Sequence, residues 1–436
     1  MFFSSTRNSK LFVSFAQAIT NCIPSDGGMY APASSVNLLP WIYHMDERTK
    51  FESIAGTLTS ALLKDELSPL ISETIASKAF PFSPKLNQLD KNLYVLELFH
   101  GPTGSHKDFG VSFLASCLEH ILLMQEKTAI ILTPTNGETG SSVAKALKNK
   151  KHVKAVLLYA KGTMRGFEES DCIWNGGNIL PIEIEGDEKK CFDIAREIFT
   201  DTEIVEKFSL TLANSLNIGR LLPQAFFYTY AFTRLKNKTH GEIYYALDAG
   251  NYGNLTAGLY SWKFSLPVNG FITDCTPALN LDDDGNAFVQ DSTIPLNKRG
   301  SNDPVKPSNI ERLEEVFFTN PAVIKGFVFP AYVNIREKSY AANEAFKKYG
   351  VLLDSQTATA YAASKKRIDI TDGSEATVVL IARDHPSFDA EKIYDWCGNK
   401  IQLPEHLKPL HKNIETKHKV ASNVKQVIET LTNLLQ

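Results

Sequence analysis

Lys107 is the residue whose surroundings in the sequence most directly indicate chemistry. It follows His106 in the stretch FHGPTGSHKDFG, residues 99–110, which also contains three glycines and one proline. A lysine in such a loop could bind a phosphate, form a covalent bond through its amine, or simply be solvated. A Walker A phosphate loop requires Gly-Lys followed by Ser or Thr, whereas His106 precedes this lysine and Asp108 follows it. The sequence therefore excludes the nucleotide-loop interpretation.

No pattern in the sequence indicates a metal site. The ten histidines form no HExxH motif, and the six cysteines have no CxxC spacing, so neither a zinc site nor a dense disulfide framework is expected. The run Asp282-Asp283-Asp284-Gly285 places its glycine fourth, where a calcium loop needs it sixth. We expect a solvated loop there, no bound metal, and a reducing cytoplasm as the location.

What remains for Lys107 is chemistry on its amine. A lysine amine that becomes nucleophilic forms Schiff bases with aldehydes such as that of pyridoxal phosphate (PLP). Such a cofactor also needs a phosphate site, and DAGNYGNLTAG, residues 248–258, could provide one. Gly250 and Gly253 allow close backbone approach, and the helix that follows directs unpaired N–H groups at an anion. Alone this stretch could be an ordinary turn, but its combination with Lys107 favours a PLP site.

Composition excludes several other classes of protein. The chain has 436 residues, 43% of them hydrophobic, and a net charge of −3, which fits a globular protein and provides no field that would attract nucleic acid. The N-terminal stretch MFFSSTRNSKLFVSFAQAIT is interrupted by polar residues before an apolar signal core can form, and no apolar run reaches 18 residues. We therefore expect no export and no membrane span.

The chain repeats a short apolar run, a polar turn and an amphipathic helix, which is typical of an α/β fold with mainly parallel sheets. The strands expected on this basis are residues 129–132, 154–160, 178–186, 243–247 and 377–382, and the helices begin at 141 and 255 or span 189–200, 219–235 and 387–396. Ligand sites of such sheets lie beyond the carboxyl ends of the strands, so the turns at 133–140, 248–254 and 383–386 are the places to look. Residues 281–309 are polar and aperiodic, and they are the one segment expected to be disordered or a long functional loop.

Several motifs together resemble threonine synthase, a PLP enzyme of the tryptophan-synthase-β-like, fold type II group. They are SFAQAI at 14–19, DGGMYAP at 26–32, LELFHGPTGSHKDFG at 96–110, TNGETG at 135–140, LANSLNIGRLLPQ at 212–224 and DAGNYGNLTAG at 248–258. They occur in order from Ser14 to about His411. The resemblance implies two parallel-sheet α/β domains with the cofactor in the crevice between them, after a family-specific N-terminal segment. The expected boundaries are 1–90 for that segment, 91–240 for the smaller domain and 241–436 for the larger one.

The resemblance also implies a role for each matched residue. Lys107 would carry PLP, and the residues that would hold the cofactor are Gly250, Asn251, Tyr252, Gly253, Asn254 and Arg383. The residues that would contact the substrate are Thr135, Asn136, Gly137, Glu138, Thr139, Asn214, Ser215, Asn217 and Arg220. Arg220 is the candidate for the substrate's phosphate, because a guanidinium offers two parallel N–H groups to it; the alternative is a surface ion pair.

The family reaction converts O-phosphohomoserine and water to threonine and phosphate through PLP-stabilised carbanions, and Lys107 would also act as general base and acid. The resemblance thus implies a small phosphorylated amino acid as substrate, a monomer or homodimer, and neither a nucleic-acid nor a membrane partner.

The sequence departs from the family pattern at several positions near the expected site. Asn136 and Glu138 replace a Ser and an Asp, Gln356 replaces a His, and Ser301-Asn302-Asp303 replaces Ala-Met-Asp. In ARDHPSFD, Arg383 occupies the place of a Thr that faces the PLP ring nitrogen, and the family's Lys is lost near Phe388.

Two alternatives to threonine synthase therefore stay open: a divergent PLP lyase acting on another O-phospho hydroxy-amino acid, and a non-catalytic paralogue, against which the retained Lys107 argues. For Arg383 itself, an arrangement pointing to solvent, Asp384 or a substrate phosphate is favoured over one facing the ring nitrogen.

Overall fold

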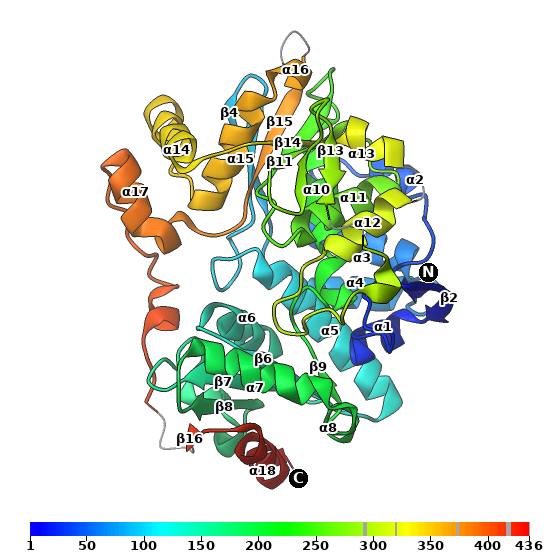
Figure 1. Cartoon of the computed structure of the whole chain (residues 1–436), viewed down its shortest axis with the longest axis vertical. Helices are drawn as coiled ribbons and strands as arrows, with labels where there is room; N and C mark the ends of the chain where they lie inside the picture. Colours follow the sequence, from blue (N-terminus) through cyan, green and yellow to red (C-terminus); the bar gives the residue numbers. More distant parts are fainter. Residues whose placement is uncertain (291–293, 319–320, 372–374, 416–419, 436) are drawn as a thin grey trace.

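The computed structural model describes residues 1–290, 294–318, 321–371, 375–415 and 420–435. Two open sheets form its two lobes (Figure 1). The architecture is α/β with mainly parallel sheets, as predicted. In the described part of the chain, no helix has the length and apolar character needed to cross a membrane.

The larger lobe is built on a six-stranded sheet with the strand order β14-β11-β10-β15-β5-β4. Its strands are β4 (Lys85–Asp90), β5 (Leu93–Glu97), β10 (Ile243–Ala246), β11 (Gly270–Asp274), β14 (Val328–Ala331) and β15 (Thr377–Ala382). All neighbours are parallel except β4 and β5. Alternate residues of β10 and β15 face opposite sides: Tyr245 and Val379 lie in the core with α10 (Gln224–Leu235) and α11 (Gly253–Lys263), while Tyr244 and Val378 pack with α14 (Ile335–Tyr349) and α15 (Ser355–Lys366).

The smaller lobe is built on a fully parallel five-stranded sheet with the order β16-β8-β7-β6-β9. Its strands are β6 (Ala129–Pro134), β7 (Val153–Ala160), β8 (Ile179–Ile184), β9 (Leu210–Thr211) and β16 (Val420–Ala421). Ile131 faces the core shared with α5 (Lys107–Gln125) and α6 (Glu138–Leu147), whereas Leu132 faces α7 (Glu188–Thr200) and α18 (Val424–Leu435). Runs buried on both faces explain why these strands read as continuous apolar stretches.

The chain crosses between the lobes more than once. After α17 (Ala390–Cys397), the C-terminal segment descends along the left side of Figure 1 and adds β16 and α18 to the smaller lobe. At the other boundary, β5 joins the larger sheet although it precedes the smaller lobe in sequence. Each sheet thus contains a strand that the expected boundaries at 90 and 240 assign to the other domain. The division of the chain at these boundaries stays a prediction.

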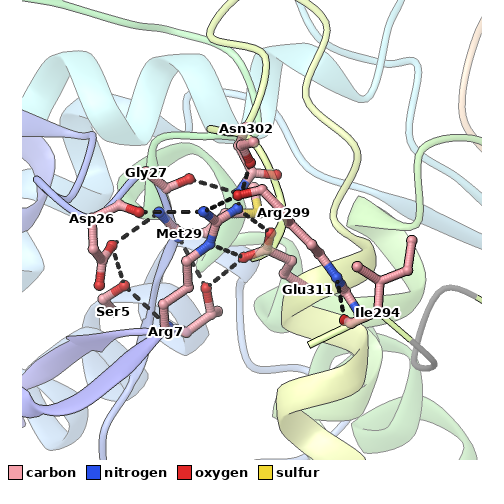
Figure 2. Close-up of polar contacts among 12 residues, drawn as sticks. Ser5, Arg7, Asp26, Gly27, Met29, Ile294, Arg299, Asn302 and Glu311 are labelled. Carbon is pink, nitrogen blue, oxygen red and sulfur yellow. Dashed lines mark hydrogen bonds and ion pairs between the residues drawn. The ribbon is translucent and has the colours of Figure 1, made fainter. Parts of the chain in front are cut away.

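The N-terminal segment forms a three-stranded antiparallel sheet, β2-β1-β3, from Asn8–Val13, Phe3–Ser5 and Tyr30–Pro32. Arg7 fastens it to the larger lobe (Figure 2): its guanidinium ion-pairs with Glu311 of α12 (Ile310–Phe318) at 2.6 Å and donates to the carbonyls of Asp26, Arg299 and Gly300. Two buried charges held this closely order the junction between segments 300 residues apart.

Most predicted elements lie where the periodicity put them, and β15 has the predicted bounds. The helix expected from residue 141 begins at Glu138, because Thr135 Oγ1 accepts from the amides of Gly137 and Gly140 and closes the turn early. The single helix expected at 219–235 is two, Ile218–Leu221 and Gln224–Leu235, interrupted at Pro223, which has no N–H to donate.

The expectation of disorder at 281–309 is wrong for the described part of that segment; residues 291–293 lie outside it. The segment contains β13 (Ala287–Val289), and its Arg299 and Asp303 ion-pair with Glu314 and Arg196. Pairing with distant residues leaves no periodic signal in the sequence.

Candidate active site

A cavity of about 710 Å³ lies where strands of both sheets end. Segments that follow β5, β6, β10 and β15 line it, so it occupies the crevice beyond the carboxyl ends of parallel strands, as predicted. Its lining includes His106, Lys107, Glu138, Thr139, Asn214, Ser215, Arg220, Gln224, the glycine-rich residues 250–254, Val305, Lys306, Pro307, Ser308, Asp354, Gln356, Arg383, Asp384 and Phe388.

Lys107 is the first residue of α5, and its amine faces this cavity. The Nζ atom donates to Glu138 Oε2 at 2.7 Å, which joins the start of α5 to the first turn of α6. The helix that carries Lys107 is anchored from within by Phe109, which packs edge-on against Phe51 at a ring distance of 5.3 Å. Because this helix end is fixed, the backbone from which the Lys107 amine extends has a defined position.

Backbone pairing ties the loop before Lys107 to the end of β15. The His106 amide donates to the Arg383 carbonyl at 2.7 Å, and the His385 amide donates to the Gly104 carbonyl at 2.8 Å. Between them, the Ser105 hydroxyl hydrogen-bonds to the Asp384 carboxylate. Lys107 and Arg383 are therefore held at fixed places relative to each other, although 276 positions separate them.

Two ionisable groups beside Lys107 are fully buried. Burial raises the pKa of Asp108 to about 6, against the hydrogen bonds from the Thr103 amide and hydroxyl that favour its charged form. Burial lowers the pKa of His106 to about 4, so its imidazole is neutral at pH 7. Its Nδ1 lies 3.6 Å from Asp384, beyond hydrogen-bonding distance. His106 therefore provides no positive charge to the site at neutral pH.

The glycine loop, residues 248–254, lines the cavity with its residues 250–254. Gly250 has φ +50°, and Tyr252, unusually for a residue with a side chain, has φ +62°. These conformations turn the chain directly into α11, which starts at Gly253. Asn251 braces the loop by donating to Ser215 Oγ at 3.0 Å. The start of an 11-residue helix combined with a tight glycine turn is a suitable site for a phosphate.

Arg220 enters the same cavity from α9 (Ile218–Leu221) and is 7% exposed. Its Nε and Nη1 atoms are buried and have no hydrogen-bond partner among the described residues. Burial lowers the pKa of Arg220 to about 10, so the guanidinium is still charged at neutral pH. Buried charged donors without a partner are costly in a folded protein. The structure therefore contains a site prepared for an anion, and the surface ion-pair alternative for Arg220 is wrong.

Comparison with known proteins identifies the family. No family model matches the chain, but threonine synthase of Escherichia coli is 30% identical over 402 residues, which cover 91% of each chain. The chain belongs to the threonine synthase family. Threonine synthase of Haemophilus influenzae is 28% identical over 402 residues, again covering 91% of each chain.

Solved structures agree with that relationship. The crystal structure of the E. coli threonine synthase superposes with a TM-score of 0.79 at 27% identity, covering 99% of this chain and all of the other. A PLP-bound threonine synthase from Brucella melitensis, with a TM-score of 0.81 over 100% of this chain and 99% of its own, is 21% identical and shares the fold. The fold is that of the fold type II PLP-dependent enzymes, which confirms the fold and family predictions.

The cavity fits the cofactor of the threonine synthase family. A primary amine, a helix start shaped by Gly250 and Gly253, and the unpartnered guanidinium of Arg220 all face one space. PLP bears an aldehyde for the amine and a phosphate for the backbone N–H groups, and a phosphorylated substrate would bring a second phosphate. Lys107 and the glycine loop would therefore hold PLP.

The TNGETG loop, residues 135–140, contributes less to the cavity than expected. Glu138 and Thr139 line it, whereas Thr135, Asn136 and Gly137 do not. Thr135 is buried, and its hydroxyl accepts hydrogen bonds from two loop amides. Gly137, with φ +115°, is packed against Arg165. These three residues shape the turn that aims Glu138 at Lys107.

Among the residues expected to bind substrate in LANSLNIGR, Asn214, Ser215 and Arg220 line the cavity and Asn217 does not. Asn217 is fully buried: its amide donates to the Ile19 carbonyl at 2.8 Å, and its oxygen caps α9. The structure therefore places Asn217 behind the site, where it fixes the helix that carries Arg220.

Arg383 and Gln356, two of the departures from the family pattern, contact each other in the cavity wall. Arg383 Nε donates to Gln356 Oε1 at 3.0 Å, and Arg383 Nη2 pairs with Asp248 at 2.8 Å. Of the directions expected for Arg383, solvent is wrong because the side chain is buried, and its hydrogen-bonded carboxylate is Asp248 and not Asp384; the direction toward a substrate phosphate stays a prediction. Attraction to a carboxylate on the neighbouring strand's loop determines this direction.

Sequence reasoning missed several residues of the cavity. Asp354, whose pKa burial raises to about 6, caps α15 beside Gln356, and Asp384 follows Arg383 directly. Residues 305–308 lie opposite them, and Lys306 is held over the Phe192 ring at 4.3 Å. The only available signals were the adjacency of Asp384 to Arg383 and the unusual length of the loop that contains Lys306.

Proposed function

We propose that this chain converts O-phosphohomoserine and water to threonine and phosphate. The observation that carries the proposal is the buried, unpartnered guanidinium of Arg220, which faces the same cavity as the Lys107 amine. A substrate that bears both an amino group and a phosphate satisfies the two groups at once. Asn214 and Ser215 border the same region.

When bound, PLP supplies an electron sink for the carbanions that form at the substrate's Cα and then Cβ. The amine of Lys107, once released from the cofactor by the incoming substrate, removes protons from Cα and Cβ, returns one to Cα and delivers one to Cγ, which becomes the methyl group. Glu138, 2.7 Å from that amine, accepts the proton that the amine must lose before it can act again. Arg220 holds the phosphate that leaves from Cγ, and water adds its hydroxyl at Cβ.

The test is an assay of the purified, PLP-loaded protein with O-phosphohomoserine. We expect equal amounts of phosphate and threonine, and no product with Lys107→Ala. Phosphate without threonine, or no turnover in a protein that carries PLP, contradicts the proposal. The absence of any covalently bound PLP would instead favour the non-catalytic paralogue.

A second candidate is a PLP lyase for another O-phospho hydroxy-amino acid. The Arg383–Gln356 contact favours it, since both residues depart from the family pattern and both line the cavity. A panel of phosphorylated amino acids ranked by kcat/KM separates the two candidates. We further infer a cytoplasmic monomer or homodimer without a nucleic-acid partner, supported by the net charge of −3.

A further inference from the structure

One donor of Arg383 faces the cavity without a partner in the described part of the chain. Its Nε and Nη2 atoms are engaged by Gln356 and Asp248, whereas no described group bonds to Nη1. Nη1 lies 3.0 Å from the place that a Cβ on Gly250 would take. The guanidinium therefore lies against the first glycine of the glycine loop, with one N–H edge open.

The order of the strands puts this edge in the middle of the site. In the larger sheet, β15 lies between β5 and β10. Lys107 follows β5, the glycine loop follows β10, and Arg383 follows β15. A cofactor attached to Lys107 at one end and to the glycine loop at the other lies over the end of β15. Its pyridine nitrogen is the ring atom opposite the carbon that bears the aldehyde, so it is turned away from Lys107.

We propose that Arg383 Nη1 donates a hydrogen bond to the ring nitrogen of PLP and keeps that nitrogen unprotonated. This inference rests on the proposed PLP site. A guanidinium has five donors and no acceptor, so a ring nitrogen that contacts it must accept. A protonated nitrogen would also meet a positive charge at hydrogen-bonding distance.

The phosphate of cofactor or substrate is the competing partner for this donor. The charges around Arg383 disfavour it: Asp248 is paired to the guanidinium at 2.8 Å, and the carboxylates of Asp354 and Asp384 also interact with it. A phosphate dianion would be repelled by these carboxylates, whereas a neutral ring nitrogen would not. Arg220 also interacts with the carboxylates of Asp108 and Asp384, but no described carboxylate is hydrogen-bonded to it, so Arg220 is the guanidinium better suited to a phosphate.

A neutral ring withdraws less electron density than a protonated one. Removal of the Cα proton by Lys107 is therefore slower in this chain than in a variant with a hydroxyl at position 383. This difference in the rate of proton removal can be measured as the rate at which the Cα proton exchanges with deuterium from solvent.

The experiment uses the full chain loaded with PLP that carries nitrogen-15 in its ring, and it measures the nitrogen and phosphorus NMR shifts. We expect the shift of a neutral pyridine in the native protein from pH 6 to 9. Arg383→Thr is expected to move the nitrogen shift and accelerate Cα exchange, while the phosphorus shift stays in place. Arg383→Met serves as a second variant, and Arg336→Thr, on the exposed start of α14, is the matched control.

A protonated ring nitrogen in the native protein overturns the inference, and so does a nitrogen shift that neither Arg383 variant moves from its native value. A change confined to the phosphorus shift would reassign Arg383 to the phosphate and also overturn it. Failure of the cofactor to attach to Lys107, read from borohydride labelling, would count against the proposed function and is thus distinguishable from these results.

Discussion

The Lys107 amine and the Glu138 carboxylate form an ion pair at 2.7 Å at the edge of the cavity. The lysine is the first residue of α5 and the glutamate the first residue of α6, so the contact depends on the starts of these two packed helices being in place. About a quarter of the lysine side chain is exposed, at 23%. An amine that is reachable, charge-paired and directed into a cavity is suited to form and release a covalent bond.

Lys107→Ala is expected to abolish the covalent attachment of PLP. Borohydride reduction of the loaded protein followed by peptide mapping should place the label on Lys107 alone. Lys145→Ala, on the outer side of α6 and paired with Glu168, is the matched control and should be labelled normally. Label on any lysine other than Lys107 would show that the amine has been assigned to the wrong residue.

Gly250→Ala should weaken PLP binding. The residue has φ +50°, which costs a side-chain residue about 1–2 kcal/mol, and the added methyl would lie 3.0 Å from Arg383 Nη1. Gly350→Ala is the control, because Gly350 has φ +70° with nothing within 4 Å of the added carbon. Titration of the apoprotein with PLP should give a raised Kd for Gly250→Ala alone. Equal Kd values for the two variants would mean that the loop does not contact the cofactor.

Arg220→Ala should lower kcat/KM for a phosphorylated substrate, by an amount equivalent to a loss of about 2–5 kcal/mol in transition-state stabilisation, since it removes a desolvated charged partner. Arg220→Lys should recover part of the loss, because an ammonium keeps the charge but not the paired N–H groups. A decrease below about 1 kcal/mol would be that of an exposed ion pair. Inhibition by inorganic phosphate should weaken in parallel. An unchanged inhibition constant would show that Arg220 does not bind the phosphate.

Local sequence pattern predicted the strands and turns but not the partners of the side chains. The bounds of β15 follow from an apolar run and the turn residues beside it, within about ten positions. The pairing of Arg383 with Asp248 joins residues 135 positions apart, and nothing in either segment indicates it. Likewise, Asn217 looked like a substrate ligand because its type and spacing suit one, yet the fold turns it toward the Ile19 carbonyl.

Asp354 gives the protein a defined pH dependence of stability. Its folded-state pKa is raised to about 6 by burial, with Asp384 and Arg383 as the charged groups that face it, whereas in the unfolded chain it is about 3.9. The protonated form is favoured by folding, so the contribution of Asp354 to stability is greatest below pH 4 and falls as the pH rises through 6, by up to about 3 kcal/mol. Asp354→Asn keeps the N-cap acceptor for the Gln356 and Thr357 amides and removes this fall. Urea midpoints of variant and native protein should therefore diverge between pH 4 and 6; parallel curves would contradict the shift.

Arg7→Met should destabilise the junction between the N-terminal sheet and α12. Arg7 and Glu311 are 8% and 4% exposed and 2.6 Å apart, and removal of one partner leaves the other charge buried and unpaired, at a cost of about 3–5 kcal/mol. The double variant Arg7→Met/Glu311→Met should recover part of that loss, because no unpaired charge is left behind. Urea midpoints of the three variants measure this, and a double variant less stable than both single ones would contradict it.

The same variants separate the junction from the site. The neighbouring Arg312 donates to the Ser215 and Leu216 carbonyls at the cavity wall and also to the Tyr30 carbonyl of β3, and it makes these contacts without Arg7. We therefore expect Arg7→Met to lower the urea midpoint while the loaded protein keeps its Kd for PLP. Arg312→Met removes the donor to the Ser215 carbonyl and so loosens the residue whose hydroxyl accepts from Asn251; it should raise that Kd. If Arg7→Met raised the Kd for PLP as much as Arg312→Met, the N-terminal sheet would have to be counted among the elements that position the glycine loop.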